Sequence, residues 1–404
     1  MKVDLLSWLL EHYGQEQPKP DPELSRLRRA LGTLVSEIQK KTIVTIAGTN
    51  GKGETTLRLS GFLGTRSHTV WISPHVTRLT ERFRSEDGEI SEAELQDLVF
   101  QCHGKLQGRS EKLSFYEFLF FVFLTWSKNR NPETLLLEVG LGGRLDAVNV
   151  FGADLVLLPS ISRDHQEFLG NRYDLILREK LALMRPGKTL LSYLSLDYLR
   201  LKTQELQQQG GFQWKDFDEL ELAPAYDFSR RNQILAYAAF RFLQGESLDS
   251  LSNFDENFPH KELVPLESRG ELLSATHSYL LFGSHNVDGM RKLIQFLHSG
   301  TYNFFRPPYD GVIVAFSRRD VRDQRVLLRM LKEAKLGEVL VTVFSHPKAA
   351  SPALMQELAT QEGLRFVHDS QSYVQGQNEG PKTFLVTGSY YFLGDFKTKL
   401  ARER

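Results

Sequence analysis

The chain has 404 residues, of which 41% are hydrophobic and 25% are charged. A chain of this size and composition can bury a substantial core and favours two or three domains. Its 50 lysine and arginine residues balance its 50 aspartate and glutamate residues, so the formal net charge at pH 7 is zero. A neutral chain has no overall field that draws it to nucleic acid or to an anionic membrane. We therefore expect a small-molecule substrate and neither of those partners.

The cysteine content and the apolar runs indicate where the protein works. The single cysteine, Cys102, cannot form an intramolecular disulfide, and we interpret it as a small buried hydrophobic residue. The longest apolar run, residues 113–126, contains Glu117 and falls short of the roughly 20 residues that span a bilayer. Charge interrupts residues 1–16 too often for a signal peptide. The sequence therefore predicts a cytoplasmic protein with a buried helix at residues 113–126.

Strands and helices alternate along the first part of the chain. Residues 5–38 are predicted to be helical, with a proline-rich break at 18–22. Strands are then predicted at 41–47, 69–72, 134–139 and 154–158, and helices at 55–63, 113–126 and 231–243. Loops rich in glycine or polar residues follow the strands directly, which is typical of a doubly wound parallel sheet of the α/β class.

A second alternating series begins at Glu271, after a polar stretch at residues 247–265. Its strands are predicted at 279–282, 311–316, 338–344, 365–368 and 383–386, with helical segments between them. The sequence therefore predicts two domains, residues 1–268 and residues 269–404. The first is expected to hold the doubly wound sheet of a P-loop-type domain, and the second to be a smaller Rossmann-like α/β domain.

A glycine-rich segment between the first predicted strand and the helix after it is typical of a phosphate-binding loop. Its residues are Gly48, Thr49, Asn50, Gly51, Lys52 and Gly53. Glycines let successive backbone N–H groups converge on a phosphate, and the helix N-terminus adds its positive end. Lys52 would neutralise charge on the β- and γ-phosphates. The spacing G-x-x-G-K is shorter than the usual loop, so a tight turn without a ligand is the alternative for this segment alone.

A second candidate segment runs from Glu138 to Asn149. Glu138 stands at the end of a predicted strand, and the glycine-rich loop after it carries Arg144 and Asp146, a set that suits metal and phosphate handling. His165, after the next strand, places an imidazole near the same edge of the sheet. Taken singly, Asp146 would be a turn residue and His165 a structural histidine. Three strand ends at one edge favour a site.

In order, these segments resemble the motifs of the folylpolyglutamate synthase and dihydrofolate synthase family, which belongs to the Mur ligase superfamily. The motifs are GTNGKG at 48–53, SPH at 73–75, EVGLGGRLDAVN at 138–149, DH at 164–165, LG at 169–170, REK at 178–180, PGK at 186–188, SRG at 268–270, GSHN at 283–286 and GSYYFLG at 388–394. The resemblance covers nearly the whole chain, and EVGLGGRLDA is its most specific part.

The resemblance implies an ATP-dependent ligase that forms an amide bond. In that family ATP phosphorylates the substrate's carboxylate to an acyl phosphate, and the amine of L-glutamate attacks it. The expected substrates are dihydropteroate or a reduced folate together with L-glutamate, and the expected cofactors are ATP and Mg²⁺. Residues 1–268 would bind ATP, residues 269–404 would form the glutamate-ligase domain, and the protein would be a monomer.

The resemblance also implies roles for individual residues. The catalytic residues would be Lys52, Lys180, His165, Arg269 and His285. The ATP-binding residues would be Gly48, Thr49, Asn50, Gly51, Lys52, Gly53, Glu54, Thr55, Asn232, Arg269 and His285. The metal ligands would be Ser73, Glu138, His165, Glu54 and Lys180, the last after carbamylation to an anion. The substrate loop would comprise Arg82, Arg144, Asp146 and Asn149.

Two residues depart from the family pattern where ATP is expected to bind. Glu54 replaces a hydroxyl residue that ligates magnesium and adds negative charge beside the phosphates, unless Thr55 supplies the hydroxyl. Phe282 replaces an aspartate expected to hold the ribose, and it offers only packing or stacking. A non-catalytic descendant that binds a pterin or a partner protein is therefore a second hypothesis. A ligase of the same superfamily with a different acid substrate is the third.

Overall fold

The computed structural model contains two compact units. Unit 1 comprises Met1–Ala223 and Ser229–His260, and unit 2 comprises Pro224–Phe228 and Lys261–Arg404. The structure describes residues 4–14, 24–108, 112–220, 223–224, 227–254, 266–300, 306–376 and 380–402. The predicted proline-rich break and the end of the predicted polar stretch lie outside these residues. The assignment of separate roles to residues 1–268 and 269–404 stays a prediction.

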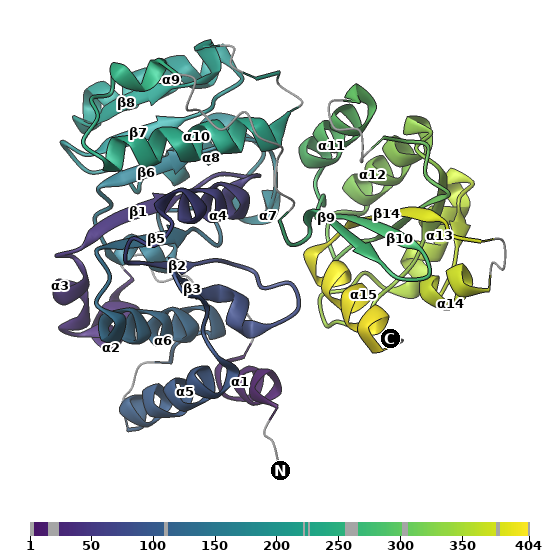
Figure 1. Ribbon diagram of the computed structural model, residues 1–404, viewed down its shortest axis with the longest axis horizontal. Helices are drawn as coiled ribbons and strands as arrows, with labels where there is room; N and C mark the ends of the chain where they lie inside the picture. The colour runs from purple at the N-terminus through teal and green to yellow at the C-terminus, as the bar shows by residue number, and fades with distance from the viewer. Residues whose placement is uncertain are drawn as a thin grey trace. The chain divides into compact units, whose positions relative to one another are not determined.

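Unit 1 is built on a mostly parallel sheet. Its strands are β1 (Thr42–Ile46), β2 (His68–Trp71), β3 (Phe83–Ser85), β4 (Gly88–Glu89), β5 (Thr134–Glu138), β6 (Leu155–Leu158), β7 (Thr189–Ser192) and β8 (Gln213–Asp216). Within the described residues the order is β4-β3-β2-β5-β1-β6-β7-β8, and β3 and β4 run antiparallel (Figure 1). Ile46 pairs with Glu138 on one side and with Leu157 on the other. The carboxyl ends of β1, β5 and β6 therefore meet at one edge, where the predicted site loops begin.

Helices cover both faces of this sheet. They are α1 (Leu5–Tyr13), α2 (Ser25–Leu31), α3 (Leu34–Ile38), α4 (Lys52–Leu63), α5 (Glu92–Leu106), α6 (Phe115–Arg130), α7 (Gln166–Leu169), α8 (Tyr173–Leu181), α9 (Asp197–Gly210) and α10 (Phe228–Leu243), with short 3-10 turns at η1 (Leu79–Arg82), η2 (Ala147–Val150), η3 (Asp218–Leu220) and η4 (Ser250–Ser252). Successive strand residues point to opposite faces. Ile43 and Leu137 pack in a core shared with α6 and α8, whereas Val44 and Leu136 pack in a core shared with α4 and α10.

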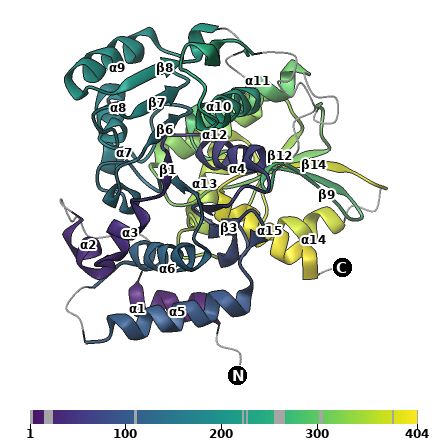
Figure 2. The ribbon, with the colours of Figure 1, turned by 60° about the vertical axis from the view of Figure 1, so that its left-hand side comes forward.

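The most apolar helix of unit 1, α6, is buried on almost every side. It begins at a capping box, in which Ser114 Oγ accepts from the Glu117 N–H while the Glu117 carboxylate accepts from the Ser114 N–H. One side of α6 packs on the sheet, and α1 and α5 pack against it as well (Figures 1 and 2). This arrangement explains an apolar run with no polar face. No helix among the described residues is long and apolar enough to cross a membrane.

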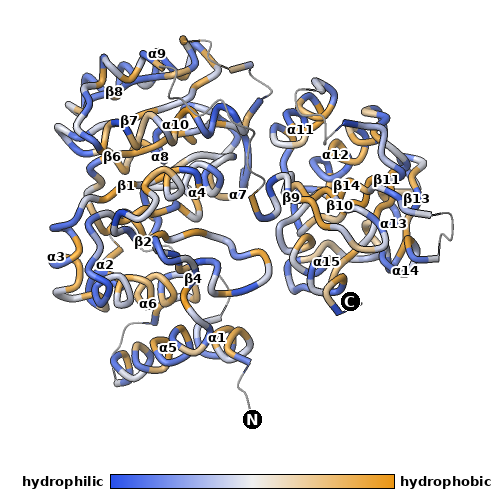
Figure 3. The backbone as a smooth tube through the Cα atoms, in the orientation of Figure 1, coloured by the Kyte–Doolittle hydropathy of each residue, from blue (hydrophilic) through white to orange (hydrophobic). Residues whose placement is uncertain are grey.

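Unit 2 is a smaller α/β layer structure. Its strands are β9 (Arg269–Ser274), β10 (Ser278–Phe282), β11 (Gly311–Ala315), β12 (Glu338–Val341), β13 (Arg365–Phe366) and β14 (Thr383–Gly388), and its helices are α11 (Val287–Ser299), α12 (Val321–Ala334), α13 (Pro352–Glu362), α14 (Ser370–Gln375) and α15 (Tyr390–Arg402). Within the described residues the order is β13-β12-β11-β14-β10-β9, and only β9 is antiparallel to its neighbour. Hydrophobic residues gather along β10 and β14 (Figure 3). One face packs against α11, α12 and α13, and α15 packs against β14.

The predicted α/β class, with a doubly wound sheet and a second, smaller α/β domain, is confirmed. Every strand predicted from the sequence is present, with shifts at the ends. β3, β4, β7, β8 and β9 were not predicted. Several of these strands are short or polar, as in the QWKD segment of β8. The hydrophobic period is too brief there to distinguish a strand from a loop.

Candidate active site

The phosphate-loop residues connect β1 to α4 and are hydrogen-bonded to the segment that follows β6. Thr49 N–H donates to the Ser160 carbonyl (3.0 Å), and Asn50 N–H donates to Ser160 Oγ (2.9 Å). Gly51 caps α4 with φ +84°, a conformation that favours glycine. α4 begins at Lys52, so the N–H groups of its first turn have no partner within the helix and remain available to an anion. The predicted strand, loop and helix are therefore in place.

The side chain of Glu54 is buried, with 2% of its surface exposed, and its carboxylate is held by neighbouring side chains. Arg58 donates to Glu54 Oε1 through Nε (3.0 Å) and Nη2 (2.7 Å). Ser229 Oγ donates to Oε1 (2.7 Å), and Asn232 Nδ2 donates to Oε2 (2.8 Å). This carboxylate, predicted as a metal ligand and ATP contact, therefore joins the first turns of α4 and α10.

Asn232, predicted to contact the nucleotide, lies against the phosphate loop. A Cβ atom added at Gly51 would stand 2.5 Å from Asn232 Oδ1. The amide of Asn232 therefore occupies the space that a side chain at position 51 would need. A side chain at position 51 would have to displace the Asn232 amide, which bonds to Glu54, in addition to adopting the positive φ.

Two hydroxyl groups near the loop are buried without a protein partner. Thr55 Oγ1 and Ser73 Oγ make no hydrogen bond to any of the described residues. The backbone N–H of Ser73 donates to Glu138 Oε2 (2.9 Å). The residue that carries the orphaned hydroxyl therefore lies next to the Glu138 carboxylate, where β2 and β5 end. An orphaned hydroxyl beside a buried carboxylate suits a hard cation, which prefers oxygen ligands.

Lys180 on α8 reaches both predicted site loops. Its Nζ donates to the Gly48 carbonyl (2.9 Å) and to the Gly142 carbonyl (3.4 Å), and only 3% of the residue is exposed. Burial, aided by the positive charge of Lys52, lowers the pKa of Lys180 from 10.5 to about 7. The structure therefore places a partly neutral amine between the phosphate loop and the glycine-rich loop.

The glycine-rich loop after β5 is organised around Asp146. Its carboxylate accepts from the N–H groups of Gly140 (2.9 Å), Leu141 (3.0 Å) and Val148 (3.1 Å) and from the Tyr116 hydroxyl (3.2 Å). Burial raises the pKa of this carboxyl group, while those backbone hydrogen bonds oppose the shift. Asp146, predicted as a substrate-loop residue, therefore shapes the loop from inside.

The other predicted substrate-loop residues lie in different environments. Asn149 Nδ2 donates to the Arg144 carbonyl (2.8 Å), while the Arg144 side chain is exposed and its Nε bonds to Glu179 (3.0 Å). Arg82 is fully buried, and its Nε donates to His75 Nδ1 (2.9 Å). Among these four residues, Arg144 is the one whose charged group is open to solvent.

His165 lies at the start of α7, where it is the N-cap residue. Its side chain is 45% exposed, and its Nδ1 is 3.8 Å from Glu167 Oε1. Within the described part of the chain, no group of three or more His, Cys, Asp or Glu residues is placed to hold a metal ion. Such a group would not include hydroxyl ligands such as Ser73, so the metal-binding roles of Ser73, Glu138 and His165 stay predictions.

Arg269 and His285, the predicted nucleotide contacts of unit 2, both lie beside Tyr390. Arg269 Cζ is 5.1 Å from the centre of the Tyr390 ring, and the His285 ring centre is 5.9 Å from it. A Cβ atom at Gly283 would stand 2.2 Å from the same ring. The tyrosine therefore positions the loop after β10 as well as both predicted contacts.

Phe282 is a core residue of unit 2. Its side chain is buried, and its ring centre lies 6.4 Å from that of Phe228 and 6.0 Å from that of Phe296. The residue that replaces the expected ribose-binding aspartate is therefore taken up in packing between β10 and α11.

Sequence reasoning did not single out Arg58, Ser229 or Tyr116, and it included Tyr390 only as a member of the GSYYFLG motif. A signal was present for two of them. Glu54 and Arg58 are four residues apart in one helix, a spacing at which opposite charges meet, and Ser229 and Asn232 share one face of α10. That these two pairs meet each other is decided by packing, which no local pattern reveals.

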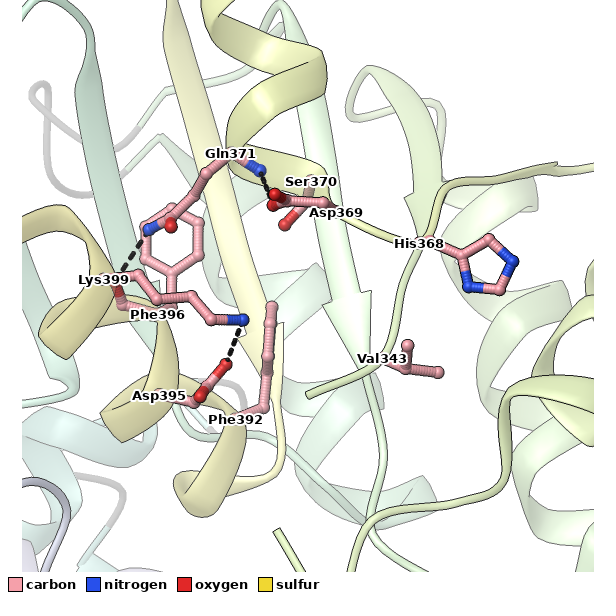
Figure 4. A pocket seen from close by; sticks show the side chains of 9 residues that line it. All are labelled: Val343, His368, Asp369, Ser370, Gln371, Phe392, Asp395, Phe396 and Lys399. Atoms are coloured by element: carbon pink, nitrogen blue, oxygen red, sulfur yellow. Dashed lines mark hydrogen bonds and ion pairs between the residues drawn. The ribbon is translucent and has the colours of Figure 1, made fainter. Parts of the chain in front are cut away.

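Unit 2 also contains a hollow that holds none of the predicted site residues (Figure 4). It is lined by Val343, His368, Asp369, Ser370, Gln371, Phe392, Asp395, Phe396 and Lys399. Several of its polar side chains already have partners: Lys399 bonds to Asp395 (2.8 Å), and Gln371 Nε2 donates to the Phe396 carbonyl (2.9 Å). This hollow is not part of the candidate active site.

The chain is similar over its whole length to curated and solved proteins, although no protein-family model matches it. It is 24% identical to the dihydrofolate synthase/folylpolyglutamate synthase of Bacillus subtilis over 98% of both chains. It is 36% identical to the Escherichia coli protein of the same name over 46% of this chain and 44% of that one.

Solved structures share the fold. The bifunctional folylpolyglutamate synthase/dihydrofolate synthase of Yersinia pestis, complexed with AMPPNP and Mn, matches with a TM-score of 0.77 and 23% identity over 98% of both chains. The folylpolyglutamate synthase of Mycobacterium tuberculosis complexed with ADP matches with a TM-score of 0.80 and 19% identity over 99% of this chain and 98% of that one.

Proposed function

We propose that the chain is a member of the family of dihydrofolate synthases and folylpolyglutamate synthases, to which it is similar over nearly its whole length. It is proposed to be an ATP-dependent ligase that adds L-glutamate to dihydropteroate, to reduced folates, or to both. One observation carries the proposal. The buried amine of Lys180 joins a phosphate-type loop at Gly48 to the glycine-rich loop at Gly142. This arrangement brings the predicted nucleotide loop and the predicted substrate loop to one edge of the sheet.

The proposed reaction has two steps. An oxygen of the substrate carboxylate attacks the γ-phosphorus of ATP, the bond to the β-phosphate oxygen breaks, and ADP leaves an acyl phosphate behind. The amine of L-glutamate then attacks the acyl carbon, loses a proton, and expels inorganic phosphate to form the amide. The N–H groups at the start of α4 and the ammonium of Lys52 would stabilise the transferring phosphoryl group. Arg269 and His285 are proposed to contact the nucleotide phosphates from unit 2.

Magnesium is the metal that this chemistry calls for, and part of the predicted ligand set fits it. Ser73 Oγ is orphaned beside the Glu138 carboxylate, so these two groups would hold the ion, which would neutralise phosphate charge when bound. Glu54 does not fit, because its carboxylate is already held by side chains of α4 and α10. Thr55 offers a buried hydroxyl at the next position.

Carbamylation of Lys180 is proposed because its environment favours the neutral amine. Burial lowers the pKa of this lysine to about 7, and only the neutral amine attacks carbon dioxide. In that step the amine nitrogen bonds to the carbon and loses a proton, which converts a cation into an anionic ligand. A carbamate signal in the ¹³C NMR spectrum of protein equilibrated with ¹³C-bicarbonate is expected, and its absence from Lys180→Met would assign it.

The function is tested by ADP release from the purified chain with ATP, Mg²⁺ and L-glutamate. Dihydropteroate or a reduced folate is expected to stimulate release, and the product gains one glutamate by mass spectrometry. Lys52→Ala is expected to lower kcat/KM about 10²–10³-fold, since it removes charge from the phosphoryl-transfer site. ADP release that is stimulated by a different carboxylic acid, and not by dihydropteroate or a folate, would favour a ligase of the same superfamily with another acid substrate. No release with any acid would favour the non-catalytic descendant. Cytoplasmic location and a monomeric state remain predictions.

A further inference from the structure

The negative charge of the Glu54 carboxylate is paired with Arg58, and both of its oxygens accept hydrogen bonds from neighbouring side chains. Arg58 supplies an opposite charge through two nitrogens, and Ser229 and Asn232 supply further donors. Arg58 is itself mostly buried, with 8% of its side chain exposed. Withdrawing the carboxylate toward a metal ion would leave a buried guanidinium and two buried donors without their acceptor, which is costly. The ion pair also cancels the negative charge that position 54 adds near the phosphates.

Asn232 connects this carboxylate to the phosphate loop. Its Nδ2 donates to Glu54 Oε2 (2.8 Å). Its Oδ1 would be only 2.5 Å from a Cβ atom added at Gly51, so the amide packs directly against this glycine. Fixing the amide therefore limits how far Gly51 can move toward α10. Gly51 is the N-cap of α4, so its conformation sets the direction of the first N–H groups of the helix.

Two consecutive residues at the start of α10, Phe228 and Ser229, each have contacts within their own unit. Ser229 belongs to unit 1 and bonds to Glu54, while the preceding residue, Phe228, belongs to unit 2. The Phe228 ring packs against Phe282 (6.4 Å between centres) and Phe296 (5.1 Å). Glu54 and Phe282, the two departures from the family motifs, thus hold consecutive residues at the beginning of the same helix.

From these contacts we propose that Glu54 is a positioning residue: it holds Asn232 against Gly51, and thereby shapes the phosphate loop, without ligating a metal ion. The proposal rests on the proposed function only in taking a nucleotide as the ligand of the loop. In this proposal Glu54 does not take over magnesium binding from the hydroxyl residue that the family pattern has at position 54. Its carboxylate instead supports the shape of the phosphate loop.

The test is ADP binding to the full chain, measured by calorimetry in EDTA and in Mg²⁺. Glu54→Gln removes the ion pair and one acceptor and is expected to weaken ADP binding about tenfold in both buffers, the equivalent of about 1.4 kcal/mol. Asn232→Ala is expected to do the same, and the double variant to be little weaker than either single one, because both act through one contact. Weakening confined to Mg²⁺ would identify Glu54 as a metal ligand and overturn the proposal.

Two further variants guard against loss of folding. Ser229→Ala removes a single hydrogen bond to Glu54 and is expected to weaken ADP binding two- to fivefold in both buffers. Glu362→Gln is the matched control, because Glu362 is also a buried carboxylate held by arginines, Arg325 and Arg329, but belongs to unit 2. It is expected to leave ADP binding unchanged, and an equal weakening there would attribute the effect to general destabilisation.

Hydrogen exchange without nucleotide separates this proposal from the proposed function. Glu54→Gln is expected to speed amide exchange at residues 48–53 and at the first turn of α10, and Glu362→Gln to leave both segments unchanged. If the unaltered chain binds no ADP, the proposed function fails, whereas faster exchange would still support the positioning role. Unchanged exchange in Glu54→Gln would overturn it.

Discussion

The amine of Lys180 shows how much a buried environment changes one residue. The lysine is surrounded by the protein, lies near Lys52, and bonds to carbonyl oxygens of two loops. Burial disfavours the charged form, so the pKa falls to about 7. The sequence places this residue on a helix, where a lysine is usually exposed, and only the resemblance to the family pointed to a special role.

The pKa of Lys180 makes stability depend on pH. Between about pH 7 and pH 10.5 the unfolded chain binds a proton at this lysine that the folded chain does not, so the free energy of unfolding rises with pH in that window. Lys180→Met removes the titrating amine. We expect its free energy of unfolding, relative to that of the unaltered protein, to fall by about 2 kcal/mol from pH 7 to pH 9. Urea unfolding in CO₂-free buffer measures it. The control is Lys188→Met, at a lysine whose side chain is 41% exposed and pairs with Asp154. An equal pH dependence in both variants would contradict the assignment.

At the scale of elements, the ends of parallel strands decide where the loops go. In unit 2 the loop after β14 passes so close to β11 that a Cβ atom at Gly388 would lie 2.1 Å from the Ala315 carbonyl oxygen. The residue also has φ +117°, and the next N–H, that of Ser389, donates to the same carbonyl (3.0 Å). The close approach lets α15 begin directly after the strand, at Tyr390, which contacts Gly283.

Gly388→Ala is expected to destabilise unit 2 by about 3 kcal/mol or more, because backbone atoms of β11 cannot move aside as a side chain can. Gly363→Ala is the matched control in the same unit. Gly363 has φ +65°, and its added Cβ would be 3.5 Å from the nearest atom, so only the backbone penalty of about 1 kcal/mol remains. Thermal unfolding followed by circular dichroism measures both. Equal losses would contradict the close approach.

At the scale of the whole molecule, each unit has hydrophobic clusters of its own. Leu157 on β6 lies in a cluster made by residues of unit 1, and Leu328 on α12 lies in a cluster centred on unit 2. Neither side chain is exposed. Separate cores allow the units to unfold in separate steps.

We expect calorimetry to resolve two transitions, each of them sensitive to its own core. Leu157→Ala and Leu328→Ala should each cost about 2–5 kcal/mol, since a leucine deletion leaves a cavity. Each variant is expected to lower a different transition and to leave the other in place. ADP added in excess should raise the transition that Leu157→Ala lowers. A single transition shifted alike by both variants would show that the units unfold as one.

Much of the fold and part of the candidate site could be predicted from the sequence. The alternation of strands and helices, the α/β class and the glycine loop before α4 all follow from local patterns. A β-branched run, a helical period and a glycine with positive φ such as Gly51 are properties of neighbouring residues. The ordered motifs also indicated the family, because they occur at fixed places along the chain.

Only the tertiary structure decided what the individual site residues touch. Glu54 meets Ser229 and Asn232, and Lys180 meets Gly48, across more than a hundred residues of chain. Phe282 becomes a core residue because Phe228 and Phe296 surround it. Burial and partnership depend on which elements pack together, and that is a property of the folded sheet rather than of any segment. The sequence by itself therefore determined the fold class and the resemblance to the family, and packing decided which side chains hold the carboxylate of Glu54.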